Sequence, residues 1–245
     1  MTARRLYAPL LPDAGGMVSL SEAPSRHVHV LRLKVGDQVV LFDGRGREAS
    51  ARIRTIGEDE VVCQAEPPSK AEPGGTRLVL MLAVPKGSKV DDCVRMATEL
   101  GVHEVALMQT ERTVARWDPE RAKSRVDRLT RIASEAAAQS ERRDVPVIHP
   151  PKPCRAWLDQ VPHSALGVAF AARARARLDA LTELPEQIWC AIGPEGGFTV
   201  PELEAFRGAG FAIVGLGDLV LRVETAVPAA MALVRDRVAH LVQAR

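Results

Sequence analysis

The stretch "WCAIGPEGGFTVPELEAF", residues 189–206, joins an apolar segment to a helical pattern through Gly-Pro-Glu-Gly-Gly. Glycines between a strand and a helix let a ligand approach the main chain closely, because glycine has no Cβ and the first helical N–H groups are unpaired. The stretch "IVGLGDLVLRVETAVPAA", residues 213–230, repeats this order. We expect the two loops to lie side by side at the carboxyl ends of neighbouring parallel strands, where open α/β sheets bind ligands.

The sequence around these loops alternates between apolar strand-like runs and helical patterns. This alternation predicts an α/β domain with a mainly parallel sheet over residues 71–245. The closing helix has little polar interruption, so we expect it to be buried, partly at a dimer interface. Strands are expected at 77–85, 104–110, 165–170, 187–193 and 211–217, and helices at 89–100, at 119–139, from 201 and from 224.

Residues 1–70 have a different, strand-rich pattern. Short strand-like segments occur at 27–33, 37–44, 48–56 and 60–67, separated by Gly, Asp and Pro. The dipeptide Asp43-Gly44 is a strong hairpin signal. These features predict a small β-barrel or sheet, and "PPSKAEPGGT" at 67–76 is typical of a linker to the second domain.

The composition narrows the class of protein. A chain of 245 residues with 46% hydrophobic residues can bury one large core or two modest ones. No signal-peptide pattern occurs in "MTARRLYAPL", and no apolar run approaches the roughly 20 residues that cross a bilayer. The four cysteines form no CxxC pair and no HExxH occurs, so we expect buried reduced thiols, no metal and a cytoplasmic location.

The net charge of +2 conceals two basic clusters. Residues 26–54 and residues 112–131 each contain seven Lys or Arg against three Asp or Glu. Each cluster is either a solvated, salt-bridged surface or a set of phosphate contacts, and one cluster in each domain makes the two interpretations about equal. Because aromatic residues are only 4% of the chain, RNA recognition through backbone charge and shape fits better than a row of stacked bases.

The glycine loops match neither common phosphate-binding fingerprint. Phe198 and Thr199 follow Gly197 where a P-loop has Lys and Ser or Thr. A dinucleotide fingerprint belongs at the first strand of its domain, whereas these glycines lie near the C-terminus. Two alternatives remain, namely main-chain groups that bind an adenine edge, or two tight turns capped by glycine.

Four segments, in this order along the chain, resemble one known family. They are "HVLRLKVGDQVVLFDGRG" at 29–46, "PKGSKVDDCVRMATELGV" at 85–102, "SEAAAQSERRDVP" at 134–146, and "IGPEGGFTVPELEAF" with "LGDLVLRVETA" at 192–206 and 216–226. The chain closely resembles the small-subunit ribosomal RNA uridine-N3 methyltransferases of the SPOUT, or trefoil-knot, class. The resemblance covers nearly the whole chain.

The resemblance implies an architecture and a reaction. It implies a PUA-like RNA-binding β-barrel at residues 1–70 and a SPOUT α/β methyltransferase domain with a deep trefoil knot at 71–245. The implied cofactor is S-adenosyl-L-methionine, and the implied partners are a second copy of the chain and small-subunit rRNA or the assembled subunit, with no membrane and no metal. The reaction is methylation of uridine N3 in 16S rRNA. The alternatives are a knotted ribose 2′-O-methyltransferase and a non-catalytic RNA-binding assembly factor.

The resemblance also implies roles for individual residues. Arg222 would stabilise negative charge on uracil O2 or O4, unless it pairs with Glu224, and Glu224 would accept the N3 proton or cap its helix. Glu195 would contact the cofactor or cap the helix that starts near 201, and the segment at 167–171 adds a third cofactor loop. The implied cofactor-binding residues are Ile192, Gly193, Pro194, Glu195, Gly196, Gly197, Leu216, Gly217, Leu221, Thr225 and Ala226, and the RNA-binding residues are Arg26, Arg32, Lys34, Arg45, Arg47, Lys86, Arg112 and Arg142.

The chain departs from the family pattern at several positions. Leu219 stands where the family usually has Arg, Val223 where it usually has Thr, and Glu141 where it usually has Gly. Loss of a loop arginine counts against a mechanism with two cations beside the base, and Leu219 and Val223 together are the features that favour the non-catalytic alternative. A histidine of the family has no single counterpart, because Arg26, His27 and His29 compete for its position.

Overall fold

The computed structural model describes residues 4–58, 60–70, 75–178 and 182–243. The chain divides into two compact units. The N-terminal unit comprises Met1–Gly74 and Ala133–Val145, and the C-terminal unit comprises Gly75–Ile132 and Pro146–Arg245. Each unit is described by itself.

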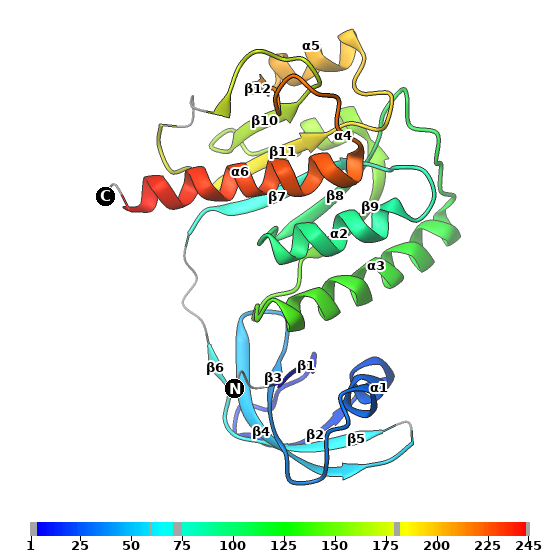
Figure 1. Ribbon diagram of the computed structural model, residues 1–245, viewed down its shortest axis with the longest axis vertical. Coiled ribbons are helices and arrows are strands. Elements are labelled where there is room, and N and C mark those ends of the chain that lie inside the picture. The colour runs from blue at the N-terminus through cyan, green and yellow to red at the C-terminus, as the bar shows by residue number, and fades with distance from the viewer. Residues whose placement is uncertain (1–3, 59, 71–74, 179–181, 244–245) are drawn as a thin grey trace. The chain divides into compact units, whose positions relative to one another are not determined.

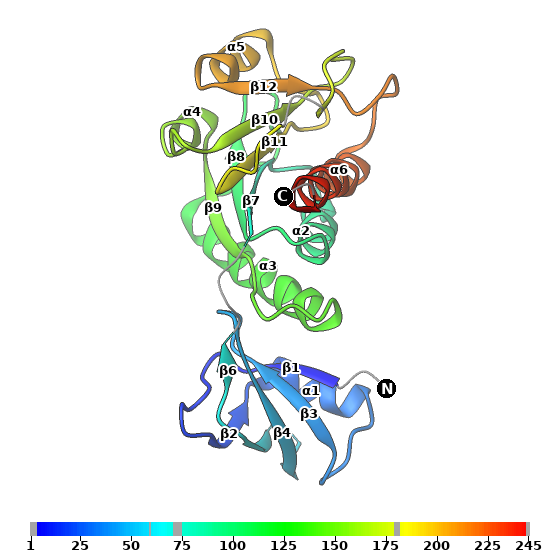
Figure 2. The same ribbon diagram turned by 90° about the vertical axis from the view of Figure 1, so that its left-hand side faces the viewer.

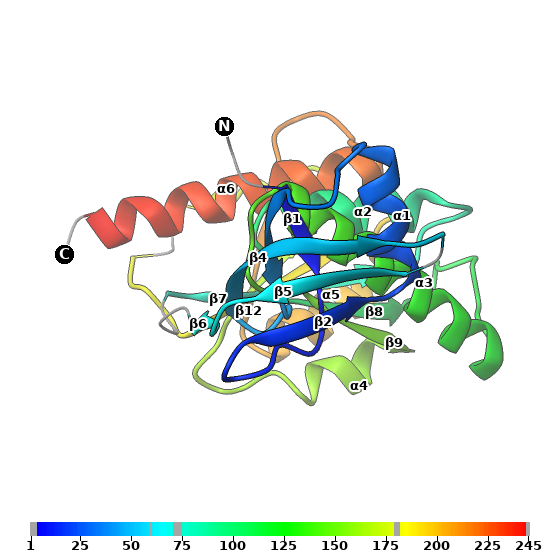
Figure 3. The ribbon, with the colours of Figure 1, turned by 90° about the horizontal axis from the view of Figure 1, so that it is seen from below.

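The N-terminal unit is a curved sheet in the order β1-β3-β4-β5-β2, with β6 paired to β4 (Figure 3). Strands β1 and β3 are parallel and the other pairs are antiparallel. Leu41, Ile53 and Val61, all fully buried, lie in the core of this unit. The strands are β1 (Arg4–Tyr7), β2 (Gly16–Leu20), β3 (Gln38–Phe42), β4 (Arg47–Ile56), β5 (Val61–Ala65) and β6 (Ser69–Lys70).

The predicted strand at residues 27–33 is wrong. Residues up to Val30 belong to helix α1 (Glu22–Val30), which follows the N-cap residue Ser21 and has Glu22 in its first turn. The alternation of His and Val in this segment imitates a strand, but Val28 is fully buried whereas Val30 is 76% exposed. A short helix can pack on the core through a single apolar residue. The alternation of apolar and polar residues with a period of two therefore did not indicate a strand here.

The predicted hairpin at Asp43-Gly44 is confirmed. Strands β3 and β4 pair on either side of residues 43–46, and Gly44 has φ of +74°. The Asp43 carboxylate accepts hydrogen bonds from the main-chain N–H groups of Arg45 (2.7 Å) and Arg47 (3.0 Å), which closes the turn. In the segment expected to be a linker, Ser69 and Lys70 form β6, and residues 71–74 lie outside the described residues.

The C-terminal unit contains a six-stranded sheet in which every pair is parallel, as predicted. Its order is β12-β10-β11-β7-β8-β9, so the strand that comes first in the chain lies inside the sheet. Strand β9 was not predicted. The strands are β7 (Arg77–Ala83), β8 (Glu104–Gln109), β9 (Val147–Pro153), β10 (Leu166–Phe170), β11 (Gln187–Ile192) and β12 (Phe211–Val214).

Helices cover both faces of this sheet (Figure 2). On one face, α4 (Cys154–Leu158) and α5 (Val200–Gly208) pack on a cluster that includes Met81 of β7. On the other face, α2 (Lys89–Glu99) and α6 (Val223–Gln243) lie side by side (Figure 1). Apolar residues of β7 face both layers because successive side chains alternate across a strand. Helix α3 (Pro119–Gln139) has the bounds expected from the sequence.

Helix α6 buries one face only. Its buried residues are Val223, Val227, Ala230, Met231 and Val234, which confirms that the closing helix enters the core. Leu233 and Val242 are 49% and 54% exposed. No helix in the described part of the chain has the length and apolar character needed to span a membrane.

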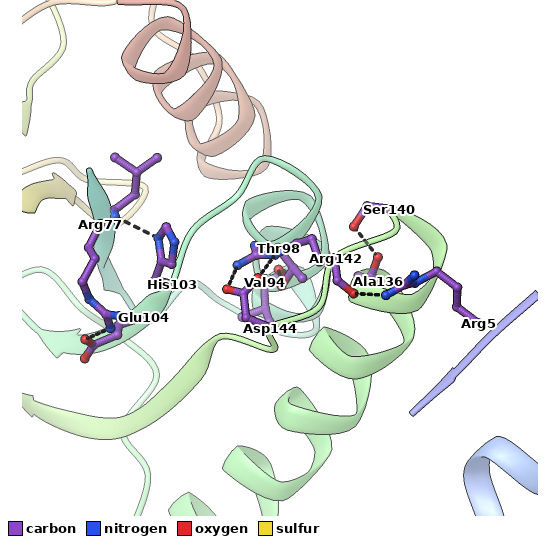
Figure 4. A network of polar contacts seen from close by, with 11 residues as sticks. Arg5, Arg77, Val94, Thr98, His103, Glu104, Ala136, Ser140, Arg142 and Asp144 are labelled. Atoms are coloured by element: carbon purple, nitrogen blue, oxygen red, sulfur yellow. Dashed lines mark hydrogen bonds and ion pairs between the residues drawn. The ribbon is translucent and has the colours of Figure 1, made fainter. Parts of the chain in front are cut away.

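A charged cluster lies at the amino ends of the central strands (Figure 4). Arg77 donates to Glu104 Oε1 at 3.0 Å, and His149 Nε2 lies 2.8 Å from Glu104 Oε2. The hydrogen bond to His149 and the contact with Arg77 lower the pKa of Glu104 against the opposing effect of burial. The main-chain N–H of Leu78 donates to His103 Nδ1 at 3.0 Å, which ties the start of β7 to the loop before β8.

All four cysteines are buried, as expected from the sequence. Burial raises the pKa of Cys63 to about 11 and the pKa of Cys93, Cys154 and Cys190 to about 12. A thiol with so high a pKa is protonated at neutral pH and is a poor nucleophile, so the cysteines are structural residues.

Candidate functional site

The two glycine loops meet in one pocket of about 160 Å³ at the carboxyl ends of three parallel strands. The prediction that they follow neighbouring strands is wrong, because β10 lies between β11 and β12. The loop after β10 therefore takes part as well. The pocket is lined by Phe170, Ala171, Ala172, Ile192, Gly193, Pro194, Glu195, Gly196, Gly197, Leu216, Leu219, Val220, Leu221, Val223 and Ala226.

The first glycine loop, residues 192–197, is a tight turn that requires glycine. A Cβ at Gly193 would lie 3.2 Å from Phe198 N and 3.3 Å from Gly197 C, both main-chain atoms with little room to move. Gly197 has φ of +68°, and its N–H donates to Pro194 O at 2.8 Å. The turn thus brings main-chain groups to the pocket, and a Cβ at Gly193 would press on two main-chain atoms of the same turn.

The capping box of α5 lies beyond this loop, at Thr199 and Glu202. The Thr199 side chain accepts from the Glu202 N–H, and the Glu202 carboxylate accepts from the Thr199 N–H at 2.8 Å. Glu195 therefore does not cap α5. Its carboxylate accepts from the main-chain N–H of Lys86 at 3.1 Å and lies 3.8 Å from Lys89 Nζ. These contacts tie the first glycine loop to the segment between β7 and α2.

Arg112 supports the same loop from another side. Its Nη1 donates to Gly196 O at 2.7 Å, and a Cβ at Gly196 would lie 3.1 Å from Arg112 Cδ. The sequence indicated Arg112 as an RNA contact, and the structure places its guanidinium on the main chain of the first glycine loop. Since Arg112 lies 84 residues from Gly196 in sequence, no local motif could have shown this contact.

The second glycine loop, residues 215–222, carries exposed apolar side chains beside the pocket. Leu219 and Val220 line the pocket yet are 76% and 66% exposed. Gly217 and Thr225, which the family pattern indicated as cofactor residues, are not among the lining residues. Leu219, Val220 and Val223 line the pocket and lie inside the expected cofactor loop at 216–226, although none of them was singled out as a cofactor contact.

Arg222 and Glu224 lie at the start of α6, next to the pocket. Arg222 is exposed, and among the described residues no carboxylate lies within ion-pair distance of its guanidinium. Glu224 lies 3.3 Å from Lys89 Nζ instead. Its own backbone N–H, the Lys89 ammonium and the nearby charge of Arg222 lower the pKa of Glu224. The site thus combines an available guanidinium, an ionised carboxylate and a backbone-lined pocket.

Comparison with known sequences accounts for this combination. A family model described as "RNA methyltransferase domain" matches residues 72–235, which is two thirds of the chain. A second, described as "RNA methyltransferase PUA domain", matches residues 20–66. The chain belongs to this RNA methyltransferase family. Its N-terminal unit is accordingly PUA-like, and its C-terminal unit is the methyltransferase domain.

Individual members of the RNA methyltransferase family align over most of the chain. The ribosomal RNA small subunit methyltransferase E of Bacillus subtilis (strain 168) is 30% identical over 208 residues, 81% of each protein. The protein of the same name from Mycobacterium bovis is 29% identical over 240 residues, 96% of this chain and 92% of the relative.

Solved structures agree with this assignment. The ribosomal RNA small subunit methyltransferase E of Neisseria gonorrhoeae, bound to S-adenosyl methionine, has 28% identity and a TM-score of 0.87 over 96% of this chain and 98% of that one. A methyltransferase of Legionella pneumophila in complex with the same cofactor has 26% identity and a TM-score of 0.89 over 97% of this chain and 98% of that one.

Two of the basic residues expected to be RNA contacts, Arg47 and Arg142, form ion pairs with carboxylates. Arg47 donates to Asp13 at 2.6 Å and to Leu11 O at 3.1 Å. Arg142 pairs with Asp144, and the Arg142 side chain is only 11% exposed. Both therefore have structural contacts in the N-terminal unit. Arg26 is paired more loosely, at 3.6 Å from Glu22, and the exposed basic side chains of this unit include Arg32, Lys34 and Arg45.

Proposed function

We propose that this protein is an S-adenosyl-L-methionine-dependent methyltransferase that methylates N3 of a uridine in 16S rRNA. The observation that supports this function best is the single pocket formed by both glycine loops, with Arg222 exposed at its edge. Membership of the RNA methyltransferase family gives the reaction class. The assignment of the target atom as uridine N3 rests on the resemblance of the loop motifs and on the way Arg222 can stabilise charge on uracil.

The residues present fit this cofactor. The apolar side chains of Phe170, Ile192 and Leu221 suit an adenine ring. The turn at Gly193 leaves main-chain groups able to form hydrogen bonds with the polar edge of that ring. Bound S-adenosyl-L-methionine supplies an electrophilic methyl group on a sulfonium. Arg112 and Glu195 hold the first glycine loop in shape through hydrogen bonds to or from the main chain, and we assign most of the cofactor contacts to main-chain groups.

Arg222 is the residue to which we assign the chemistry at the base. Uracil N3 is a weakly acidic imide, and its lone pair becomes available only as the N3 proton leaves. The negative charge that then develops on O2 and O4 is stabilised by a cation held nearby, as in an oxyanion site. The exposed guanidinium of Arg222 needs to break no ion pair with a described carboxylate before it takes this role.

Glu224 has two candidate roles, and its electrostatics favour one of them. A general base works best with a pKa near the working pH, whereas the pKa of Glu224 is lowered from its ordinary value. A carboxylate in the first turn of α6 is also stabilised by the helix dipole. We therefore propose that Glu224 fixes the start of α6 and the position of Arg222, and that the N3 proton leaves to solvent.

A second copy of the chain completes the site in this proposal. The pocket is small for a cofactor of this size, and Leu219 and Val220 are largely exposed beside it. Leu233 and Val242 of α6 are further exposed apolar residues. Covering these side chains requires a partner surface, and a homodimer supplies one. We also propose that the chain around β12 and α6 forms the trefoil knot of the SPOUT class.

The assignment is tested by following the modified nucleoside. Purified protein, labelled S-adenosyl-L-methionine and either small ribosomal subunits or free 16S rRNA are incubated, and the RNA is digested to nucleosides for mass spectrometry. We expect label in 3-methyluridine. Label in a 2′-O-methylated nucleoside would replace the proposal by the ribose alternative, and absence of label with both substrates would favour a non-catalytic assembly factor.

A further inference from the structure

A cavity within the N-terminal unit has no role in the proposed methyl transfer. Its volume is about 560 Å³, which is within the range of pockets that hold small organic ligands. Three separate segments line it: β1, α1 and residues 134–141 at the end of α3. The residues that line it include three arginines, namely Arg4, Arg5 and Arg26, and also Tyr7, Pro24, Val30, Glu135, Ala138 and Glu141.

Part of the cavity wall is apolar. Tyr7, Pro24 and Ala138 line it from three different segments, together with Val30. Val30 is 76% exposed. A flat ring inserted here would cover Val30 and pack against the ring of Tyr7. The wall therefore suits an aromatic ligand.

The cavity also has guanidinium groups. Arg5 donates to Arg142 O at 3.1 Å and forms an ion pair with Glu48 at 2.9 Å, so its side chain is fixed and only 11% exposed (Figure 4). Arg4 is exposed, and Arg26 has one loose ion pair at 3.6 Å. Cations beside an apolar wall are the arrangement that binds a nucleotide, whose base stacks while its phosphate is neutralised.

Glu141 adds a second, independent observation. This residue has φ of +60°, in the left-handed region where a residue other than glycine is strained. It follows α3, where Arg142 N–H bonds to Ala137 O at 2.9 Å, so the turn itself is one that glycine would make without strain. The family that the chain resembles usually has glycine here. A strained glutamate at the edge of a cavity indicates that the carboxylate is needed there.

We propose that this cavity binds one unpaired guanosine of the RNA substrate, separate from the uridine that is methylated. The carboxylate oxygens of Glu135 and Glu141 accept hydrogen bonds, and guanine offers two adjacent donors, N1–H and the N2 amino group, where uracil offers N3–H alone. The base stacks on the apolar wall, and the flanking phosphates lie at Arg4 and Arg26. This inference rests on the proposed function only in taking RNA as the substrate.

A matched pair of valine variants tests whether the cavity holds a base. Val30→Asp places a charge on the cavity wall, and Val35→Asp places the same charge on a 61%-exposed valine that does not line it. The probe is a fluorescein-labelled ten-nucleotide single strand with one central G among U, measured by anisotropy at fixed salt. We expect Val30→Asp to weaken binding at least 10-fold and Val35→Asp less than 2-fold. Equal losses in the two variants would overturn the proposal.

Glu141→Gly tests whether the Glu141 carboxylate binds the hydrogen-bonding edge of guanine. Loss of the negative charge and loss of a hydrogen bond to guanine would change RNA affinity in opposite directions. Removing a negative charge by itself strengthens RNA binding. If the carboxylate binds guanine, the same variant should bind the G-containing strand about 5-fold more weakly while its melting temperature rises. An all-U strand serves as the control and should lose no affinity. Unchanged or tighter binding of the G-containing strand would rule out the guanosine site.

This test and the test of methyl transfer can fail separately. The cavity lies in the N-terminal unit, and the cofactor pocket lies in the C-terminal unit. If the protein forms 3-methyluridine but Val30→Asp and Glu141→Gly do not weaken RNA binding as expected, the guanosine site alone is refuted. If both variants weaken binding of the G-containing strand as expected but the protein forms no 3-methyluridine, the uridine-N3 assignment alone is refuted.

Discussion

The two cavities of this molecule are built in different ways. The pocket in the C-terminal unit is formed largely by main chain at the ends of three parallel strands, and it needs glycine at 193. The cavity in the N-terminal unit is formed by side chains from β1, α1 and residues 134–141. The first construction leaves a continuous glycine motif in the sequence. The second leaves no motif, because residues 134–141 lie more than 100 residues after β1 and α1 in the chain.

This difference predicts how each site responds to mutation. A site made of main-chain groups tolerates changes of side chain and fails when the backbone conformation is changed. A site made of side chains shows the reverse.

Gly193→Ala should abolish cofactor binding. The added Cβ would press on the main chain at Phe198 and Gly197, so the turn must open and its N–H and C=O groups move. We expect no detectable heat on titration with S-adenosyl-L-methionine. Gly208→Ala is the control, since a Cβ there meets nothing within 4 Å and the residue is helical. Wild-type affinity in Gly193→Ala would show that the pocket is not built from this turn.

Arg222→Met should slow single-turnover methyl transfer by roughly 10²–10³-fold, the effect of removing one preorganised donor. Cofactor affinity should stay within about 2-fold, because the guanidinium acts on the base. Arg222→Lys should keep part of the rate, since it keeps the charge but loses the planar fork. Arg207→Met, which removes an exposed arginine of α5, is the control. A full rate in Arg222→Met would eliminate this mechanism.

Glu195→Gln should weaken cofactor binding only a few-fold, although Glu195 lines the pocket. Its carboxylate accepts from Lys86 N–H, and a glutamine side-chain oxygen can accept the same hydrogen bond. The ion-pair distance to Lys89 is 3.8 Å on a partly exposed surface, which is a weak interaction. Calorimetry decides the matter. A loss as large as that of Gly193→Ala would mean that the side chain, and not the main chain, holds the cofactor.

Glu104→Gln should lower the free energy of unfolding by about 0.5–1 kcal/mol at neutral pH. The pKa of Glu104 is lower in the folded protein than in the unfolded chain, so its stabilising effect is complete above the unfolded value. The effect is lost as pH falls through the folded value. Urea unfolding at several pH values should therefore show the variant and wild type converging in acid. Glu99→Gln, at an exposed position of α2, should show little difference at any pH.

The parts of the fold that follow local rules were predictable from the sequence. Helix α3 has its expected bounds because Asp118 and Pro119 provide a clear N-terminal signal, and the Asp118 carboxylate accepts from the Arg121 N–H at 2.8 Å. The family of the chain and the PUA-like and parallel α/β units were also predicted. In each case the pattern is contained in a short continuous segment.

The failures have physical reasons. Strand β9 contains three prolines, at 150, 151 and 153, which argue against a strand in sequence alone. Proline is tolerated there because β9 is the last strand of the sheet and pairs only with β8. Helix α1 was mistaken for a strand because its buried residues are Ser25 and Val28, and a single buried apolar residue shows no helical periodicity. The position of β10 between the glycine-loop strands depends on sheet order, which no local pattern specifies.

Contacts between distant residues were likewise out of reach. The hydrogen bond from Arg112 to Gly196 O turns a residue of a basic cluster into a support for the first glycine loop. The pairing of Glu224 with Lys89 in place of Arg222 depends on how α2 and α6 pack. Charge counting over a window of sequence treats all basic residues alike, whereas the fold gives each a different partner.

The order of the parallel sheet also governs how the protein is made. Strand β7 pairs with β11 from Arg77↔Gln187 to Leu82↔Ile192, so a partner needed by β7 leaves the ribosome 110 residues after it (187 minus 77). At a translation rate of about 5–20 residues per second, one edge of this apolar strand stays unpaired for roughly 5–20 seconds until β11 has been synthesised. Over that interval β8 can already pair with its other edge. The nascent chain must therefore keep an open, aggregation-prone edge of β7 in solution until synthesis is nearly complete.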